Sequence, residues 1–258
     1  MDLEKFFRDE GIDVYAAVRT ADLPEADRAD ALQLVPDAFA IIVFGKEIPA
    51  EIYTLPQKER TRHMIRIAES LDRTARTLAN CLNAENFRSE PVPLFLPLRI
   101  VEDRVQGIIR LKQIAAWGGL GTIGKNTLLI SPRYGTRLAL SGVVTKKDTG
   151  TYGTPLTADL CRTCGRCVQE CPEGAIGFEG VNMFRCKNIR HVIPPPLVPA
   201  VLWLLRRRQL QQILAPLASW IARHATISCN RALPHVLGST AQDFWTSMML
   251  LKGQISDN

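Results

Sequence analysis

The stretch CRTCGRCVQECP runs from Cys161 to Pro172 and has the spacing Cys-x-x-Cys-x-x-Cys-x-x-x-Cys-Pro. This spacing is typical of bacterial ferredoxins, in which cysteine thiolates bind a [4Fe–4S] cluster. Three cysteines at three-residue intervals on a tight loop can reach three corners of the cluster, and Gly165 allows close approach of the backbone. The run predicts Cys161, Cys164, Cys167 and Cys171 as iron ligands. A zinc site is the main competitor, but the third cysteine and the Cys-Pro ending disfavour it.

Length and charge restrict the class of protein. The chain of 258 residues is long enough for one sizeable domain, with or without a smaller insert. Its apolar content of 46% and charged content of 22% are ordinary for a soluble globular protein. The net charge of +6 suits acidic partners, such as a flavodoxin or ferredoxin, nucleic acid or an anionic membrane. The acidic N-terminus, MDLEKFFRDEG, does not resemble a signal peptide, so we expect a cytoplasmic protein whose clustered cysteines bind metal.

The hydrophobic pattern predicts alternating helices and strands. The continuous apolar run Phe39–Gly45 predicts a buried central strand. Helices are predicted at 1–12, 24–34, 57–83 and 105–117, and extended segments or strands at 13–18, 91–98, 127–130 and 137–145, the last two around a turn at 131–135. The pattern indicates an α/β (α+β) fold with a domain at 1–150 and a cysteine module at 151–258.

The segment from Ala200 to His224 differs from the rest because it is strongly apolar and is interrupted by Pro216. Its apolar runs are shorter than the roughly 20 residues that a membrane-spanning helix needs. They predict helices that cover the cluster loops. The alternative is an interfacial helix with Trp203 and Trp220 at headgroup level and Arg206–Arg208 on phosphates, a peripheral membrane contact through 200–224.

A glycine-rich loop, GGLGTIGKN, spans Gly118–Asn126. It matches the dinucleotide fingerprint and nearly matches a P-loop, but both need a preceding strand and a following helix. Here a predicted helix precedes the loop and a β-compatible run follows, so neither motif is favoured. The glycines with Lys125 and Asn126 suit either a plain turn or a large ligand lying against the loop. Arg133 and Tyr134 follow closely, either as ordinary turn residues or as further residues of the same pocket.

GLGTIGKNTLLI (119–130), followed by CRTCGRCVQECPEGAI (161–176), resembles the epoxyqueuosine reductase family and the related cobalamin-dependent reductive dehalogenases. The resemblance covers Val105–Cys186. It implies a nitroreductase-like catalytic domain, a ferredoxin-like module with [4Fe–4S] clusters, and a cobalamin between them, with FMN as the less favoured occupant. Electrons would pass from a low-potential donor such as ferredoxin or flavodoxin, through the clusters, to cobalt. The residues implied to contact the cofactor are Gly119, Leu120, Gly121, Thr122, Ile123, Gly124, Lys125 and Asn126.

The sequence also departs from the family. The family module has eight cysteines, whereas Cys186 and Cys229 bring the candidates here only to six. One cluster would use Cys161, Cys164 and Cys167 with Cys171 or Cys229. With two clusters, the second would use Cys171 and Cys186 together with His224, His235 or an open iron site.

The position that matches the family's acidic proton donor falls at Val105, which leaves Glu102 and Asp103 as weak candidates for catalysis. We also expect a short form of the family, without the C-terminal helical-repeat domain that full-length relatives use on tRNA. Both departures argue against epoxyqueuosine as the substrate.

Two functional hypotheses follow. The first is an iron–sulfur, cobalamin-dependent reductase, an oxidoreductase acting on an unidentified small molecule. The alternative is an electron-transfer or accessory protein that reduces or reactivates a corrinoid protein or another redox partner. Nucleic-acid binding is disfavoured because it rests only on Arg206–Arg208 and the basic pI.

Overall fold

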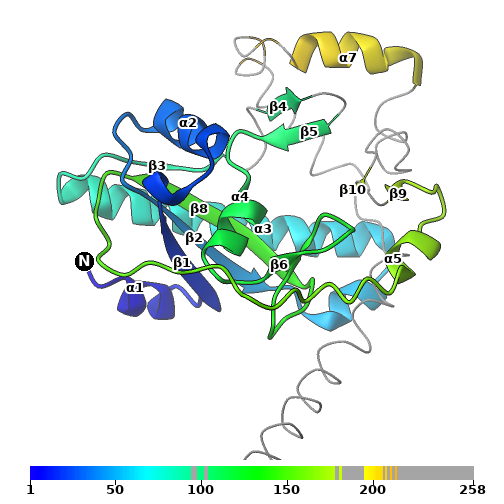
Figure 1. Ribbon diagram of the computed structural model, residues 1–258, viewed down its shortest axis with the longest axis horizontal. Helices are drawn as coiled ribbons and strands as arrows, with labels where there is room; N and C mark the ends of the chain where they lie inside the picture. The colour runs from blue at the N-terminus through cyan, green and yellow to red at the C-terminus, as the bar shows by residue number, and fades with distance from the viewer. Residues whose placement is uncertain are drawn as a thin grey trace, which may run out of the picture.

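The computed structural model describes residues 1–93, 98–101, 104–177, 180–181, 195–205, 207, 210 and 213. Its centre is a four-stranded antiparallel sheet with the strand order β1-β2-β8-β3 (Figure 1). The strands are β1 (Val14–Arg19), β2 (Ala40–Glu47), β8 (Leu138–Thr145) and β3 (Ser89–Pro91). The chain therefore has a mixed α/β fold built on an antiparallel sheet.

The predicted central strand is confirmed by β2. Residues 40–45 are all buried, and β2 pairs with β1 on one side and β8 on the other, with Ile42 opposite both Ala17 and Val143. Helices cover both faces of the sheet, so this strand is apolar throughout instead of alternating between apolar and polar residues.

Each face of the sheet has its own hydrophobic core. On one face lie α1 (Leu3–Asp9) and the long helix α3 (Gln57–Ala84), which bring Phe7, Leu71 and Leu78 against the sheet. On the other face lie α2 (Glu25–Leu34) and α4 (Leu111–Trp117), with Ala31 and Ile114 in a second core. The result is a three-layer arrangement with the sheet in the middle (Figure 1).

An ion pair joins the two helices of the second layer. Arg110, directly before α4, donates from Nε to Oδ1 of the buried Asp27 on α2 at 2.7 Å and from Nη2 to Oδ2 at 2.5 Å. The Asp27 carboxylate raises the pKa of the Arg110 guanidinium through these hydrogen bonds. This bidentate ion pair positions the start of α4, and α4 leads into the glycine loop.

The predicted helix at 105–117 is wrong in its first half. Residues 104–107 form β5 (Arg104–Gly107), which pairs with β4 (Leu98–Val101), and the helix α4 begins only at Leu111. The β-branched Val105 and the glycine at 107 both disfavour a helix, whereas pairing with β4 satisfies the backbone. The predicted helices at 1–12, 24–34 and 57–83 are confirmed within a few residues by α1, α2 and α3.

The remaining elements are short. The turn predicted at 131–135 is present, since Ser131 and Gly135 exchange backbone hydrogen bonds of 2.8 and 2.9 Å. The short elements are η1 (Thr20–Asp22), η2 (Ala50–Thr54), β6 (Thr122–Ile123), β7 (Leu129–Ile130), α5 (Arg166–Gln169), β9 (Ile176–Gly177), β10 (Gly180–Val181), η3 (Pro195–Leu197) and α7 (Val198–Leu205). The domain division at residue 150 and the cytoplasmic location stay predictions.

In the part of the chain that the structure describes, no helix has both the length and the apolar character needed to cross a membrane. The second half of the predicted apolar segment, residues 214–224, lies outside the described residues.

Candidate iron–sulfur and cofactor site

Two residues with positive φ angles shape the cysteine loop. Thr163 has φ +48° and Gly165 has φ +70°, and Gly165 lies directly before the short helix α5. The amides of Val168 and Gln169 both donate to the Gly165 carbonyl, at 3.0 and 3.1 Å. Glycine adopts this left-handed conformation without a steric penalty, which explains its place in the middle of the run. The loop reverses direction between Cys164 and Cys167.

Two neighbouring cysteines act on the Cys167 thiol. Burial raises the pKa of the Cys167 thiol above its ordinary value, and the nearby Cys161 and Cys164 raise it further. Thiolates that repel one another in this way are stabilised by a cationic iron cluster, which reverses the unfavourable electrostatics. Cys161, Cys164 and Cys167 therefore form one group with the chemistry of a cluster site.

The fourth cysteine has a different environment. The Ala175 amide donates to the Cys171 sulfur at 3.3 Å, and Cys171 does not contribute to the pKa shift of Cys167. In two-cluster bacterial ferredoxins, the cysteine at this position binds the other cluster.

Within the described ranges, no three Cys, His, Asp or Glu side chains gather closely enough to enclose a single metal ion. A tetrahedral zinc site requires four ligands around one point, whereas a cubane cluster takes its thiolates at separate corners.

The glycine loop is a small β-hairpin, made of β6 and β7. The Gly124 amide donates to the Leu128 carbonyl at 2.9 Å, and the Asn126 side chain accepts from the Leu128 amide at 3.1 Å. Lys112 of α4 donates to the Thr127 carbonyl at 2.9 Å and holds the end of the hairpin. A helix precedes the loop and a strand follows, as predicted, so the loop has neither the dinucleotide-binding nor the P-loop arrangement.

The first glycines of this loop are needed for packing within the chain. Gly119 has φ +78°, and a Cβ there would lie 2.4 Å from the Thr154 carbonyl oxygen. A Cβ on Gly121 would lie 2.3 Å from the Ile130 carbonyl oxygen. At these two positions the protein's own backbone fills the space that the loop was expected to offer a ligand.

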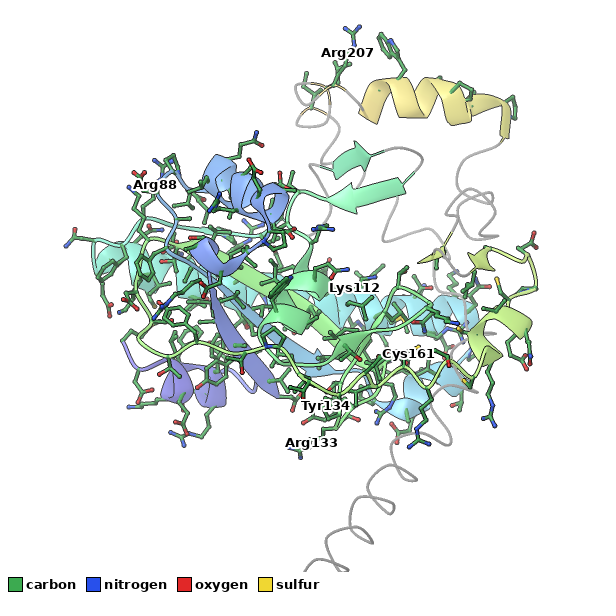
Figure 2. The ribbon with its side chains drawn as sticks, in the orientation of Figure 1. Arg88, Lys112, Arg133, Tyr134, Cys161 and Arg207 are labelled. Atoms are coloured by element: carbon green, nitrogen blue, oxygen red, sulfur yellow. The ribbon has the colours of Figure 1, made fainter. Side chains whose placement is uncertain are left out.

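Hydrogen bonds connect the glycine hairpin to the cysteine run. The Leu160 amide donates to the Thr122 hydroxyl at 3.0 Å, and that hydroxyl donates to Asp159 Oδ1 at 3.4 Å. The same carboxylate oxygen accepts from the Cys161 amide at 2.9 Å. One threonine of the hairpin and one aspartate thus place the first cysteine of the run, which Figure 2 shows on the segment leading to α5.

An open hollow of about 300 Å³ lies beside this connection. It has a mixed surface of apolar and polar side chains, contributed by α4, the hairpin and the segment before the cysteines. The residues lining it are Gln113, Ala116, Trp117, Gly121, Thr122, Ile123, Pro155 and Leu156. This volume is at the lower end of the range for small-molecule sites.

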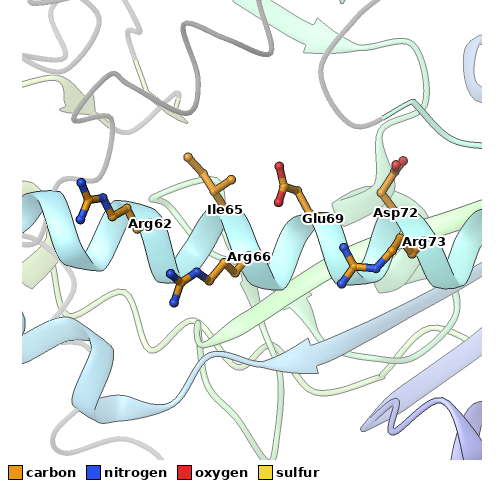
Figure 3. A pocket seen from close by; sticks show the side chains of 6 residues that line it. All are labelled: Arg62, Ile65, Arg66, Glu69, Asp72 and Arg73. Carbon is orange, nitrogen blue, oxygen red and sulfur yellow. The ribbon is translucent and has the colours of Figure 1, made fainter.

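A larger hollow of about 520 Å³ lies along α3 and has a different character. All its described lining residues come from that one helix: Arg62, Ile65, Arg66, Glu69, Asp72 and Arg73 (Figure 3). Asp72 is paired with Arg76 at 2.9 Å. None of these residues belongs to the motifs that carry redox chemistry, so the smaller hollow is the better candidate site despite its size.

The structure places some of the predicted site residues at the hollow and others away from it. Gly121, Thr122 and Ile123 line the hollow, whereas Leu120 packs against the hydrophobic core on the face of the sheet that α2 and α4 cover. Arg133 and Tyr134 are not among the residues lining it. Tyr134 is buried, and the Arg133 guanidinium lies 5.2 Å from the centre of its ring. The predicted contacts of the loop with a cofactor stay predictions.

Six predicted residues lie outside the described part of the chain: Glu102, Asp103, Cys186, His224, Cys229 and His235.

Sequence reasoning did not single out Asp159, Gln113 or Trp117. For Asp159 a signal existed, because an aspartate two residues before a cysteine can accept a hydrogen bond from that cysteine's amide. For Gln113 and Trp117 only the packing of α4 reveals the site.

Comparison with known proteins shows which proteins this chain resembles. Residues 155–177 match the family described as a 4Fe-4S binding domain. Epoxyqueuosine reductase from Listeria monocytogenes is 42% identical over 67 residues, which cover 26% of this chain and 17% of that protein. The enzyme from Lactococcus garvieae is 31% identical over 121 residues, covering 43% of this chain and 32% of that protein.

Solved structures show a similar fold. Epoxyqueuosine reductase from Streptococcus thermophilus aligns with a TM-score of 0.54 at 19% identity, covering 73% of this chain and 56% of that chain. A reductive dehalogenase aligns with a TM-score of 0.52 at 14% identity, covering 70% of this chain and 27% of that chain.

The fold and the cysteine loop thus define an iron–sulfur protein built on a mixed α/β domain. More particularly, the matched parts of the chain resemble epoxyqueuosine reductases in sequence, and its fold is similar to that of a solved epoxyqueuosine reductase and a solved reductive dehalogenase. The matched regions span no more than about a third of the curated relatives' length.

Proposed function

We propose that this chain is an iron–sulfur reductase of the epoxyqueuosine reductase type. The observation that carries the proposal is the hydrogen-bonded connection between Thr122, Asp159 and Cys161, because it holds the cluster loop against the hollow beside the glycine hairpin. A cluster on Cys161, Cys164 and Cys167 would take up single electrons within reach of a cofactor or substrate in that hollow. Its α/β part would correspond to the nitroreductase-like domain of the family.

The cofactor that we propose for the hollow is a cobalamin. When bound, it would supply a low-potential cobalt centre that reduces the substrate. Trp117, Ile123 and Leu156 offer apolar contacts to a flat macrocycle, and Gln113 and Thr122 offer hydrogen bonds to polar groups at its edge. The hollow is open, so these residues would form one wall of the site. FMN is the less favoured occupant of the same wall.

The exposure of the cysteine loop suits transfer from a separate electron donor. Cys164 is exposed, so a partner can approach the cluster closely. A low-potential donor such as ferredoxin or flavodoxin would supply the electrons. The substrate of the reductase is proposed only as a small molecule.

The same exposure supports a second candidate function. A cluster loop that is open to solvent could deliver electrons to a separate protein, such as a corrinoid protein that needs reactivation. In that case the shallow hollow would hold no cofactor of its own. The two functions differ in whether the purified chain takes up a corrinoid.

The test is anaerobic purification with measurement of iron, sulfide and corrinoid, before and after incubation with hydroxocobalamin. We expect about four irons per chain for one [4Fe–4S] cluster or about eight for two. Serine substitution of Cys161, Cys164 or Cys167 should remove about four of them, because serine is a poor ligand for a cluster that prefers thiolates. Cys81→Ser on α3 is the matched control and should keep all the iron.

Corrinoid uptake that is weakened by Trp117→Ala, with iron unchanged, would support the reductase. Iron without any corrinoid or flavin uptake would favour the electron-transfer protein. A chain that binds zinc instead of iron after anaerobic reconstitution would contradict both functions.

A further inference from the structure

Apolar side chains on α7, and on η3 directly before it, are strongly exposed. Leu197 and Trp203 expose 53% and 54% of their surface, and Ile213, further along the chain, exposes 75%. Leu197 ends η3 and Trp203 lies on α7, directly after it. Exposed apolar groups in such a cluster mark an interaction surface.

The position of α7 leaves this surface free of the protein core. The helix contacts η3 and strand β4, and Figure 1 shows it beyond the β4–β5 hairpin, on the side away from the four-stranded sheet. Its sequence, VPAVLWLL, contains no polar side chain. A helix that is apolar all round needs an apolar partner on more than the side that faces β4.

A cation accompanies the exposed indole. The guanidinium of Arg207 lies 4.3 Å from the centre of the Trp203 ring and is exposed (Figure 2). This pairing places a positive charge beside an amphipathic ring at the end of an apolar helix. Trp and Arg together are characteristic of the boundary between lipid tails and headgroups.

The charge of the surrounding sequence is strongly one-sided. Residues 180–242 contain no Asp or Glu, although the whole chain has 26 of them. The same segment contains eight basic residues: Arg185, Lys187, Arg190, Arg206, Arg207, Arg208, Arg223 and Arg231. An anionic bilayer has an apolar interior and negatively charged headgroups. An apolar helix within a segment whose only charged residues are basic complements both parts of such a bilayer.

We propose that the surface formed by Leu197, Trp203 and Arg207 binds anionic lipid bilayers, with α7 lying along the interface. A nucleic acid would satisfy the basic residues but would leave the exposed aliphatic side chains in water. As a helix of eight residues, α7 can lie along a bilayer and is too short to cross one. The proposal does not depend on the reductase function, because no cluster ligand belongs to this surface.

The experiment uses the full chain, purified anaerobically with its iron, and vesicles of phosphatidylcholine alone or mixed with phosphatidylglycerol. We expect co-sedimentation with the mixed vesicles and much weaker binding to phosphatidylcholine alone. Trp203→Ala should weaken binding about tenfold because it removes buried apolar area. Arg207→Gln should weaken it about fivefold on the anionic vesicles only.

Phe39→Ala is the matched control, since Phe39 is an exposed aromatic residue next to the sheet, away from α7. It should bind vesicles as the unchanged chain does, and all variants should keep their iron content. Absence of binding to anionic vesicles would overturn the proposal, and so would equal binding by Trp203→Ala.

Two further outcomes would assign the surface to another partner. If a duplex RNA displaces the chain from vesicles and Trp203→Ala binds that RNA unchanged, the basic segment serves nucleic acid. If light scattering shows a concentration-dependent dimer that Trp203→Ala abolishes, with no vesicle binding, the surface joins two copies of the chain. Either result would contradict membrane binding while leaving the iron and corrinoid measurements unaffected.

Discussion

Asp159 is the residue whose charge lies directly beside the first cluster cysteine. Its carboxylate accepts hydrogen bonds from the Cys161 amide and from the Thr122 hydroxyl, so it orients the loop from both sides. The potential of an iron–sulfur cluster depends on nearby charge, on hydrogen bonds and on exposure to solvent. A fixed negative charge opposes the addition of an electron, so Asp159 should hold the potential of the cluster down.

We predict that Asp159→Asn raises the reduction potential of the cluster while iron content stays unchanged. The amide oxygen of asparagine can still accept both hydrogen bonds, so only the charge is removed. Because Asp159 is exposed and solvent screens it, the increase should be on the order of tens of millivolts. A redox titration followed by electron paramagnetic resonance measures it.

Thr122→Ser is the control for Asp159→Asn, since it keeps the hydroxyl and should leave the potential in place. If Asp159→Asn leaves the potential unchanged, or if it loses iron, the carboxylate does not act through its charge.

At the scale of elements, the base of the glycine hairpin packs directly against the segment that leads to the cysteines. A Cβ on Gly119 would meet the Thr154 carbonyl oxygen, and a Cβ on Gly153 would lie 2.1 Å from the Gly118 carbonyl oxygen. The two backbones therefore lie closer than side chains would permit. This contact and the Thr122 hydrogen bonds fix how the hairpin and the cluster loop are placed relative to each other.

We predict that Gly119→Ala destabilises the protein and weakens cluster binding, because the new methyl group would separate the two backbones. The left-handed φ of Gly119 costs about 1–2 kcal/mol for alanine, and the clash adds roughly another 1–3 kcal/mol. Gly150→Ala separates these effects, since Gly150 has φ +75° but nothing within 4 Å of its Cβ position.

Urea unfolding and iron content distinguish the two glycine variants. Gly150→Ala should show only the cost of the φ angle and keep its cluster. Equal losses of stability in both variants would mean that the contact between Gly119 and Thr154 carries no energy of its own.

At the scale of the whole molecule, one antiparallel sheet supports two separate hydrophobic cores. Leu78 of α3 is fully buried on one face, and Ile114 of α4 is almost fully buried on the other. Neighbouring residues of β2 serve both cores, since Ile41 belongs to one and Ile42 to the other. Loss of packing on either face therefore weakens the strand that both layers share.

We predict that Leu78→Ala and Ile114→Ala each lower the free energy of unfolding by about 2–5 kcal/mol. Each should shift a single unfolding transition, because the shared sheet couples the two cores. Far-UV circular dichroism and tryptophan fluorescence during urea unfolding should give coincident curves. Leu32→Ala on the exposed side of α2 should be nearly neutral, and a biphasic curve for either core variant would show that the layers unfold independently.

The sequence by itself determined the features that depend on local geometry. The cysteine spacing predicts the cluster loop because three thiolates on one short loop are enough to define it. The apolar run of β2 and the amphipathic pattern of α3 predicted those elements within a few residues, since each pattern is read from consecutive positions. The order of a helix before the glycine loop likewise disfavoured both nucleotide-binding motifs.

Tertiary contacts decided the rest, because they join residues that are far apart in the chain. The register with β4 makes residues 104–107 a strand where the apolar pattern predicted a helix. Thr122 and Asp159 are 37 positions apart, and Asp27 and Arg110 are 83 apart. The glycines of the hairpin accommodate a neighbouring backbone at Gly119 and Gly121, where the sequence allowed a ligand equally well. The periodic pattern of a sequence shows which side of a helix or strand is apolar. It does not show which element packs against that side, because that contact forms only when the whole chain folds.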